Sequence, residues 1–241
     1  MRQRSILQIQ RLLLVISFLV LIGLTVIVAR ALGYGLASED GVPVQRFVWG
    51  VLNKRVALIS GHAGFDSGAV CEDANGVAIL KEADVVAIVV QRVAKRLTQA
   101  GINVTILQEY DPQLQGLQTD LLLSVHADSC IDATGFKAAR GINSQIPEVD
   151  DHFVSCLQEN YGVTTHLTIH SQSITHNMTE YHAWHKIDPM TPAGIIEVGF
   201  LGGDQELLTK HPAIVAKGIT DGILCFLSNE PLPSVAPSAS S

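Results

Sequence analysis

Four side chains capable of metal binding or proton transfer lie at or near the ends of predicted strands and helices. His62 directly follows one apolar run, and His126 closes another. Glu82 lies in the first turn of a predicted helix, and Glu197 lies inside a third apolar run. Two imidazoles and a carboxylate are a ligand set of catalytic zinc, which keeps its fourth position open for water. A second carboxylate beside that water can accept a proton and return it.

The spacing of these residues does not by itself define a site, because ligands from distant segments form no short motif. Taken singly, His62 is compatible with a loop donor, Glu82 with a solvated carboxylate and His126 with an ordinary strand-end histidine. Glu197 is the most informative of the four. It lies among isoleucine, valine and phenylalanine, and burying an unpaired carboxylate is costly, so a compensating cation or hydrogen-bond network is expected.

The elements that must position these side chains alternate between strand and helix patterns. Apolar runs predict strands at 55–60, 103–108, 120–126 and 194–200, and helical patterns cover 81–100, 149–161 and 212–227. This alternation predicts an α/β domain, a single domain with a mostly parallel twisted sheet flanked by helices on both faces. In such sheets, ligand sites collect at the carboxyl ends of the strands.

Four motifs, in this order, resemble a known family. LISGHAGFDSGA, LKEAD, LLLSVHAD and TPAGIIEVGFLGGDQELL are similar to segments of the zinc-dependent N-acetylmuramoyl-L-alanine amidases of the Amidase_3 type, which cleave bacterial peptidoglycan. The resemblance spans about residues 54–228. It implies that His62, Glu82 and His126 are the ligands of a Zn²⁺ cofactor and that Glu197 is the catalytic acid/base.

The resemblance also implies a reaction, the hydrolysis of the amide bond between N-acetylmuramic acid and L-alanine. Glu197 would take a proton from a zinc-activated water and pass it to the leaving amine. Two alternatives remain open, namely a zinc carboxypeptidase-like amidohydrolase acting on another substrate and a non-catalytic peptidoglycan-binding regulator. Peptidoglycan is the expected partner, and the sequence identifies no regulatory protein.

The chain departs from the family's pattern at several positions that are not ligand positions. Ala63 replaces a glycine, Asp128 replaces an asparagine, and Gly202-Gly203 replaces Ser-Asn. The segment QEYDPQLQGLQ stands where the family carries an arginine and an Ala-Asn pair on a helix. We expect these differences to affect substrate fit more than metal binding.

The N-terminal region carries an apolar run long enough to cross a membrane. Three arginines precede the eighteen residues 12–29, which predicts a cytoplasmic N-terminus at 1–11, a transmembrane anchor at 12–31 and an extracytoplasmic domain in the periplasm. A cleavable signal sequence is the alternative, because Ala29-Arg30-Ala31 resembles a processing site, and cleavage would give a secreted protein.

Composition defines the remaining segments and excludes one class of partner. Residues 32–53 are predicted to be a linker, 54–228 the catalytic domain and 229–241 a disordered Pro/Ser/Ala tail. The formal net charge is -7, and because residues 1–30 hold four arginines and no acid, the rest of the chain carries -11. Such an acidic protein repels phosphate backbones, so nucleic acid is not an expected partner.

Four cysteines suit an oxidising compartment. If both candidate histidine ligands bind one metal ion, the loops that follow them must be adjacent, which makes a disulfide between Cys71 and Cys130 reasonable. Two reduced thiols are the alternative for this pair. Cys156 and Cys225 lie in apolar helical patterns, and we predict that they are buried free thiols.

Five histidines lie between residues 166 and 185 and suggest two interpretations. A second metal site is one of them. Their spacing places few of the imidazoles on a single helical face. We therefore favour a substrate-groove wall or a solvated loop.

Overall fold

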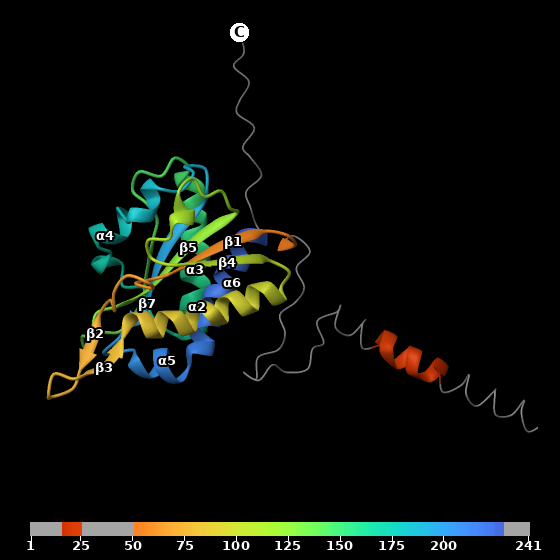
Figure 1. The fold of residues 1–241 in the computed structure, drawn as a ribbon, viewed down its shortest axis with the longest axis horizontal. Coiled ribbons are helices and arrows are strands. Elements are labelled where there is room, and N and C mark those ends of the chain that lie inside the picture. The colour runs from red at the N-terminus through yellow and green to blue at the C-terminus, as the bar shows by residue number, and fades with distance from the viewer. Residues whose placement is uncertain (1–15, 26–50, 229–241) are drawn as a thin grey trace, which may run out of the picture. The chain divides into compact units, whose positions relative to one another are not determined.

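A computed structural model describes residues 16–25 and 51–228 of the chain (Figure 1). Residues 16–25 form a helix. Within the described residues, no helix combines the length and the apolar character that a membrane span requires. The predicted anchor at 12–31 lies partly outside the described residues. Most of the predicted linker and the whole predicted tail at 229–241 also lie outside them.

The domain is built on a five-stranded sheet with the order β4-β1-β5-β7-β6. The strands are β1 (Arg55–Ser60), β4 (Asn103–Leu107), β5 (Leu121–Asp128), β6 (Lys137–Ala139) and β7 (Ala193–Phe200). The first three and β7 are parallel to one another, while β6 runs antiparallel at the edge. The aliphatic runs of β1, β5 and β7 are buried on both faces, as expected for a parallel sheet, while the edge strand β4 is mostly exposed. The predicted mostly parallel sheet is therefore confirmed, and β6 is an addition to it.

Three long helices form one layer on the sheet. They are α2 (Glu82–Gln99), α3 (Pro147–Thr165) and α6 (Pro212–Ser228). Helix α2 lies against β1, β4 and β5, helix α3 lies against β6 and β7, and α6 packs on both helices. Gly218 and Gly222 allow the close contact between α6 and α3, because a Cβ at either position would lie within 3.1 Å of a Cα atom of α3. A shorter helix, α5 (Gln205–Lys210), precedes α6.

The second face of the sheet differs from the prediction of helices on both faces. Short elements cover it, namely η2 (Pro112–Leu114), α4 (His176–Thr179) and η4 (His182–His185). Their apolar side chains, such as Leu114 and Tyr181, pack on Ile59, Leu122 and Ile195 of the sheet. The segment that supplies α4 and η4 is rich in His and Thr and lacks a long apolar helical stripe, so it forms single turns rather than a long helix.

A short hairpin was not predicted from the sequence. Strands β2 (Val70–Glu72) and β3 (Ala78–Lys81) pair antiparallel and lead directly into α2. Figure 1 shows the hairpin extending away from the sheet beside the first turn of α2. Its strands of three and four residues are too short to show a clear alternation of apolar and polar residues.

Candidate metal centre

His62 is placed at the carboxyl end of β1 by a turn with unusual backbone geometry. Its φ angle is 65°, in the left-handed region that non-glycine residues rarely adopt. Its Nδ1 lies 2.5 Å from Asp66 Oδ1 and its Nε2 lies 3.2 Å from Glu82 Oε1. The hydrogen bond with Glu82, opposed by burial, raises the pKa of His62 to about 9. The ring therefore presents Nε2 to Glu82 and is held from behind by Asp66.

Glu82 is the first residue of α2, and its buried carboxylate lies between the two histidines. Its Oε1 lies 3.2 Å from His62 Nε2 and 3.1 Å from His126 Nδ1, and it accepts the N–H of Ala127. Its Oε2 accepts the N–H of Ala69 at 2.9 Å. Burial would raise the pKa of Glu82, but the hydrogen bonds with His126 and His62 outweigh it and lower the pKa to about 2. The side chain is thus a carboxylate at neutral pH.

His126 lies near the end of β5 and is almost fully buried. Its ring meets that of His62 edge to face, with 5.0 Å between centroids. Burial lowers the pKa of His126, but the hydrogen bond with Glu82 and the charges of Glu197 and Glu109 raise it overall. Its Nε2 is buried and has no hydrogen-bond partner.

His62, Glu82 and His126 together form a candidate metal site. Their ligand atoms all lie within 4.8 Å of one another, and no other such group occurs among the described residues. Two imidazole nitrogens and a carboxylate oxygen are a donor set that suits a divalent transition metal. The structure thus brings together the three residues named as ligands from the sequence, and their chemistry fits a metal ion.

Glu197 lies beside this cluster on the neighbouring strand. It is the register partner of His126 across β5 and β7 and of Lys137 across β7 and β6. Its Oε2 is buried without a hydrogen-bond partner. Burial, opposed by the charge of His126, raises the pKa of Glu197 to about 7. A carboxyl group with this pKa exchanges protons readily near neutral pH.

A cleft of about 550 Å³ opens over these residues. The three candidate ligands and Glu197 line it together, and Tyr110, Tyr181 and His182 contribute to its wall. The cleft is large enough for part of a substrate to reach the cluster.

Glu109 is a residue of this cleft that the sequence reasoning missed. Its Oε2 accepts the N–H of His62 at 2.8 Å, and its Oε1 lies within 2.9 Å of Tyr181 Oη and His182 Nε2. Burial would raise the pKa of Glu109, but the hydrogen bond with His182 and the charge of His126 lower it to about 2. Its position two residues after β4 was an available signal, because ligand sites collect at strand ends.

The prediction for the first cysteine pair is confirmed, and that for the second is wrong. Cys71 of β2 and Cys130, which follows β5, form a disulfide. Cys156 and Cys225 form a second disulfide and are not free thiols. The second pair was missed because both residues fit an apolar helical stripe, and the sequence does not reveal that the two stripes face each other across α3 and α6.

The histidines between residues 166 and 185 differ in their exposure. His182 is partly buried and lines the cleft. The other four, at positions 166, 170, 176 and 185, are exposed.

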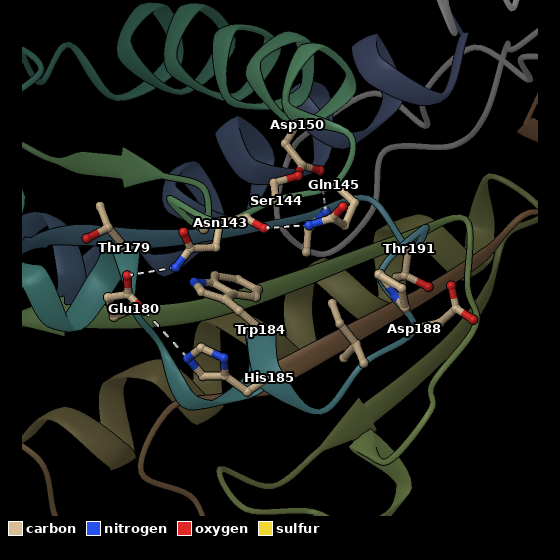
Figure 2. A pocket seen from close by; sticks show the side chains of 14 residues that line it. Asn143, Ser144, Gln145, Asp150, Thr179, Glu180, Trp184, His185, Asp188 and Thr191 are labelled. Carbon is tan, nitrogen blue, oxygen red and sulfur yellow. Dashed lines mark hydrogen bonds and ion pairs between the residues drawn. The ribbon is translucent and has the colours of Figure 1, made fainter.

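A second, smaller cavity of about 100 Å³ adjoins the first, and Glu180 lines both. Figure 2 shows Glu180 pointing toward Asn143 and His185, with Trp184 between them and the rest of the cavity. Glu180 Oε1 accepts a hydrogen bond from Asn143, and Glu180 Oε2 lies 3.6 Å from His185 Nε2. The carboxylate of Glu180 is therefore engaged on the side of the second cavity, away from the metal ligands.

Comparison with solved structures identifies the fold. A structure described as the N-acetylmuramoyl-L-alanine amidase from Clostridium difficile 630 is similar with a TM-score of 0.57 and 19% identity, covering 74% of this chain and 99% of that chain. The N-acetylmuramoyl-L-alanine amidase AmiC2 of Nostoc punctiforme has a TM-score of 0.52 and 19% identity, covering 72% and 97%. The CwlD amidase from Clostridioides difficile, solved in complex with the GerS lipoprotein, has a TM-score of 0.56 and 17% identity, covering 73% and 99%.

Comparison at the sequence level identifies the family. A search of curated proteins found no significant match. The sequence model of the Amidase_3 family, described as N-acetylmuramoyl-L-alanine amidase, matches residues 56–225, which include every candidate site residue. The chain therefore belongs to the Amidase_3 family and is an amidase that hydrolyses an amide bond of peptidoglycan.

Proposed function

We propose that the protein hydrolyses the bond between N-acetylmuramic acid and L-alanine with a Zn²⁺ ion held by His62, Glu82 and His126. The observation that carries this proposal is the convergence of both imidazoles on one oxygen of Glu82, within 3.2 Å. Glu197, on the adjacent strand, is the proposed acid/base. These residues come from four separate elements, β1, α2, β5 and β7, so a shared chemical role explains their proximity better than local sequence does.

The chemistry divides between the metal ion and the chain. Zinc, when bound, supplies a Lewis acid that polarises a carbonyl and lowers the pKa of water. Glu197 Oε2, buried and without a hydrogen-bond partner, accepts the proton of the attacking water. The same carboxyl group returns that proton to the leaving amine of L-alanine. Asp66 fixes the His62 ring, so that its Nε2 is directed at Glu82.

Assay of purified peptidoglycan fragments tests the proposal. The full-length oxidised protein, loaded with zinc, is incubated with muropeptides, and the products are analysed by mass spectrometry. The expected products carry a new L-alanine amino terminus and a free lactyl carboxylate. The Glu197→Gln variant is expected to bind one zinc ion and form no product. Loss of a terminal amino acid would instead indicate a carboxypeptidase, and zinc binding without any product would indicate a binding module.

We also infer that residues 12–31 carry the catalytic domain across the cytoplasmic membrane, as an uncleaved anchor. The arginines before the apolar run and the two disulfides of the domain support this location. Fractionation of cells and mass analysis of the N-terminus test it. An intact N-terminus in the membrane fraction, with the domain digestible by external protease in spheroplasts, is expected. A cytosolic protein with reduced cysteines would contradict the inference.

A further inference from the structure

Glu109 connects the loop of His62 to the wall of the cleft. Its side chain accepts the N–H of His62 at 2.8 Å, and its own N–H donates to the carbonyl of Ala63 at 3.1 Å. On its other side, Glu109 Oε1 accepts the hydroxyl of Tyr181 at 2.8 Å and lies 2.9 Å from His182 Nε2. The residue is only 5% exposed, so these contacts replace the water that would otherwise solvate its charge.

The contact with the backbone of His62 has a particular structural role. His62 adopts a left-handed φ of 65°, a conformation that costs a non-glycine residue on the order of 1 kcal/mol or more. Such a backbone persists when surrounding contacts hold it. A charge-assisted hydrogen bond from the N–H of His62 to a buried carboxylate is a contact of this kind.

Glu109 also lies near the ring nitrogen of His126 that faces away from Glu82. The Nδ1 of His126 faces the cluster, 3.1 Å from Glu82 Oε1, and its Nε2 lies 3.6 Å from Glu109 Oε2. The two nitrogens of His62 are used in the opposite order, since its Nε2 faces Glu82 and its Nδ1 is hydrogen-bonded to Asp66 at 2.5 Å. Histidines that bind metals commonly direct the second ring nitrogen at a carboxylate, which fixes the tautomer and the ring orientation.

We propose that Glu109 is a positioning residue of the metal site, which holds the backbone of His62 through a hydrogen bond and places its negative charge 3.6 Å from His126 Nε2, so that a proton is favoured on Nε2 and Nδ1 faces the metal. This inference rests on the proposed zinc site. It assigns a role to a residue of the segment QEYDPQLQGLQ. Glu109 is thus part of the machinery that presents both imidazoles, although it does not itself bind the ion.

A glutamine at position 109 would keep the size of the side chain and disturb this role. Two groups of donors approach the carboxylate, one on each oxygen, and glutamine offers one acceptor oxygen and one N–H₂ group. Either the N–H of His62 or the hydroxyl of Tyr181 would then face an amide N–H₂. Loss of a carboxylate behind a ligating histidine commonly weakens metal binding by about 10- to 100-fold.

Zinc affinity, measured on the full-length oxidised protein by competition with a chromophoric chelator, tests the proposal. Glu109→Gln is expected to bind zinc about 10- to 100-fold more weakly than the wild type. Glu180→Gln is the matched control, because Glu180 lines the same cleft but pairs with Asn143 and His185 (Figure 2). It is expected to bind zinc as the wild type does. Equal affinity in all three proteins would overturn the proposal, while failure of the wild type to bind zinc would overturn the metal site itself.

A second measurement needs no variant and therefore does not depend on how well Glu109→Gln folds. Long-range ¹H–¹⁵N spectra of the histidine side chains report which ring nitrogen carries the proton. In the zinc-loaded wild type, His126 is expected to carry its proton on Nε2 and His62 on Nδ1. A proton on Nδ1 of His126 would contradict the assigned orientation and overturn the role of Glu109.

Discussion

The carboxyl group of Glu197, whose Oε2 is buried, leads to a quantitative prediction about the metal-free protein. Burial raises its pKa from 4.5 to about 7, so the folded state holds this proton more tightly than the unfolded state does. The stabilisation is fully present below pH 4.5 and is lost as the pH rises through 7. Since one pKa unit corresponds to about 1.4 kcal/mol, the loss amounts to about 3 kcal/mol at most.

Glu197→Gln removes this titration while keeping the shape of the side chain. Relative to the wild type, the variant is expected to gain about 3 kcal/mol of unfolding free energy between pH 4 and pH 8. Urea unfolding with chelator present, followed by tryptophan fluorescence at several pH values, measures this difference. The other titrating groups largely cancel between the two proteins. A difference that stays within about 0.5 kcal/mol across the range would refute the reasoning, because it would place the carboxyl group in water.

Three further predictions concern the metal, the loop geometry and the second disulfide. Chelation should abolish amidase activity and lower the melting temperature. Zinc added back at 1,000 times its Kd should restore about 4 kcal/mol of unfolding free energy. Activity that persists in the presence of chelator would argue against a metal enzyme. Gly68→Ala should weaken zinc binding in titrations, because Gly68 has a φ of +61° and the added Cβ would lie 2.5 Å from Glu82 Oε2 and 2.7 Å from His62 Cδ2. A variant that binds zinc as tightly as the wild type would contradict this expected clash. Replacing Cys156 and Cys225 by serine should lower the unfolding free energy, measured in urea, by about 4 kcal/mol, because the disulfide closes a loop with a sequence separation of 69 residues. A loss under about 1 kcal/mol would show that the disulfide constrains the unfolded chain little.

The long elements of the fold could be predicted from the sequence because burial imposes a pattern on them. Strand β7 and helix α2 agree with their predicted ranges to within a residue or so. Strand β6 could not be found this way, since its three residues, KAA, are too few for any periodicity. Lys137 of this strand is nonetheless buried against Asp128, a pairing that depends on tertiary contacts alone.

The candidate site was only partly accessible to sequence reasoning. The three candidate ligands and Glu197 lie in recognisable motifs at strand ends and on a helix start, so they could be named individually. Glu109 and the wall residues Tyr181 and His182 approach the site from segments without a motif. The side chain of Glu109, which follows β4, reaches the loop after β1 and accepts the N–H of His62. No local sequence pattern encodes this contact between neighbouring strands.

The order of the cysteines along the chain bears on how the native bridges form. Cys71 joins Cys130 and Cys156 joins Cys225, so each cysteine is bonded to its immediate neighbour in sequence and the two closed loops do not interleave. During the export proposed above, the N-terminus would stay in the cytoplasm and the residues that follow the anchor would emerge first, so the earlier pair would be complete before the later pair arrived. An oxidant that joins thiols in their order of emergence would therefore yield the native connectivity directly, without help from a disulfide isomerase.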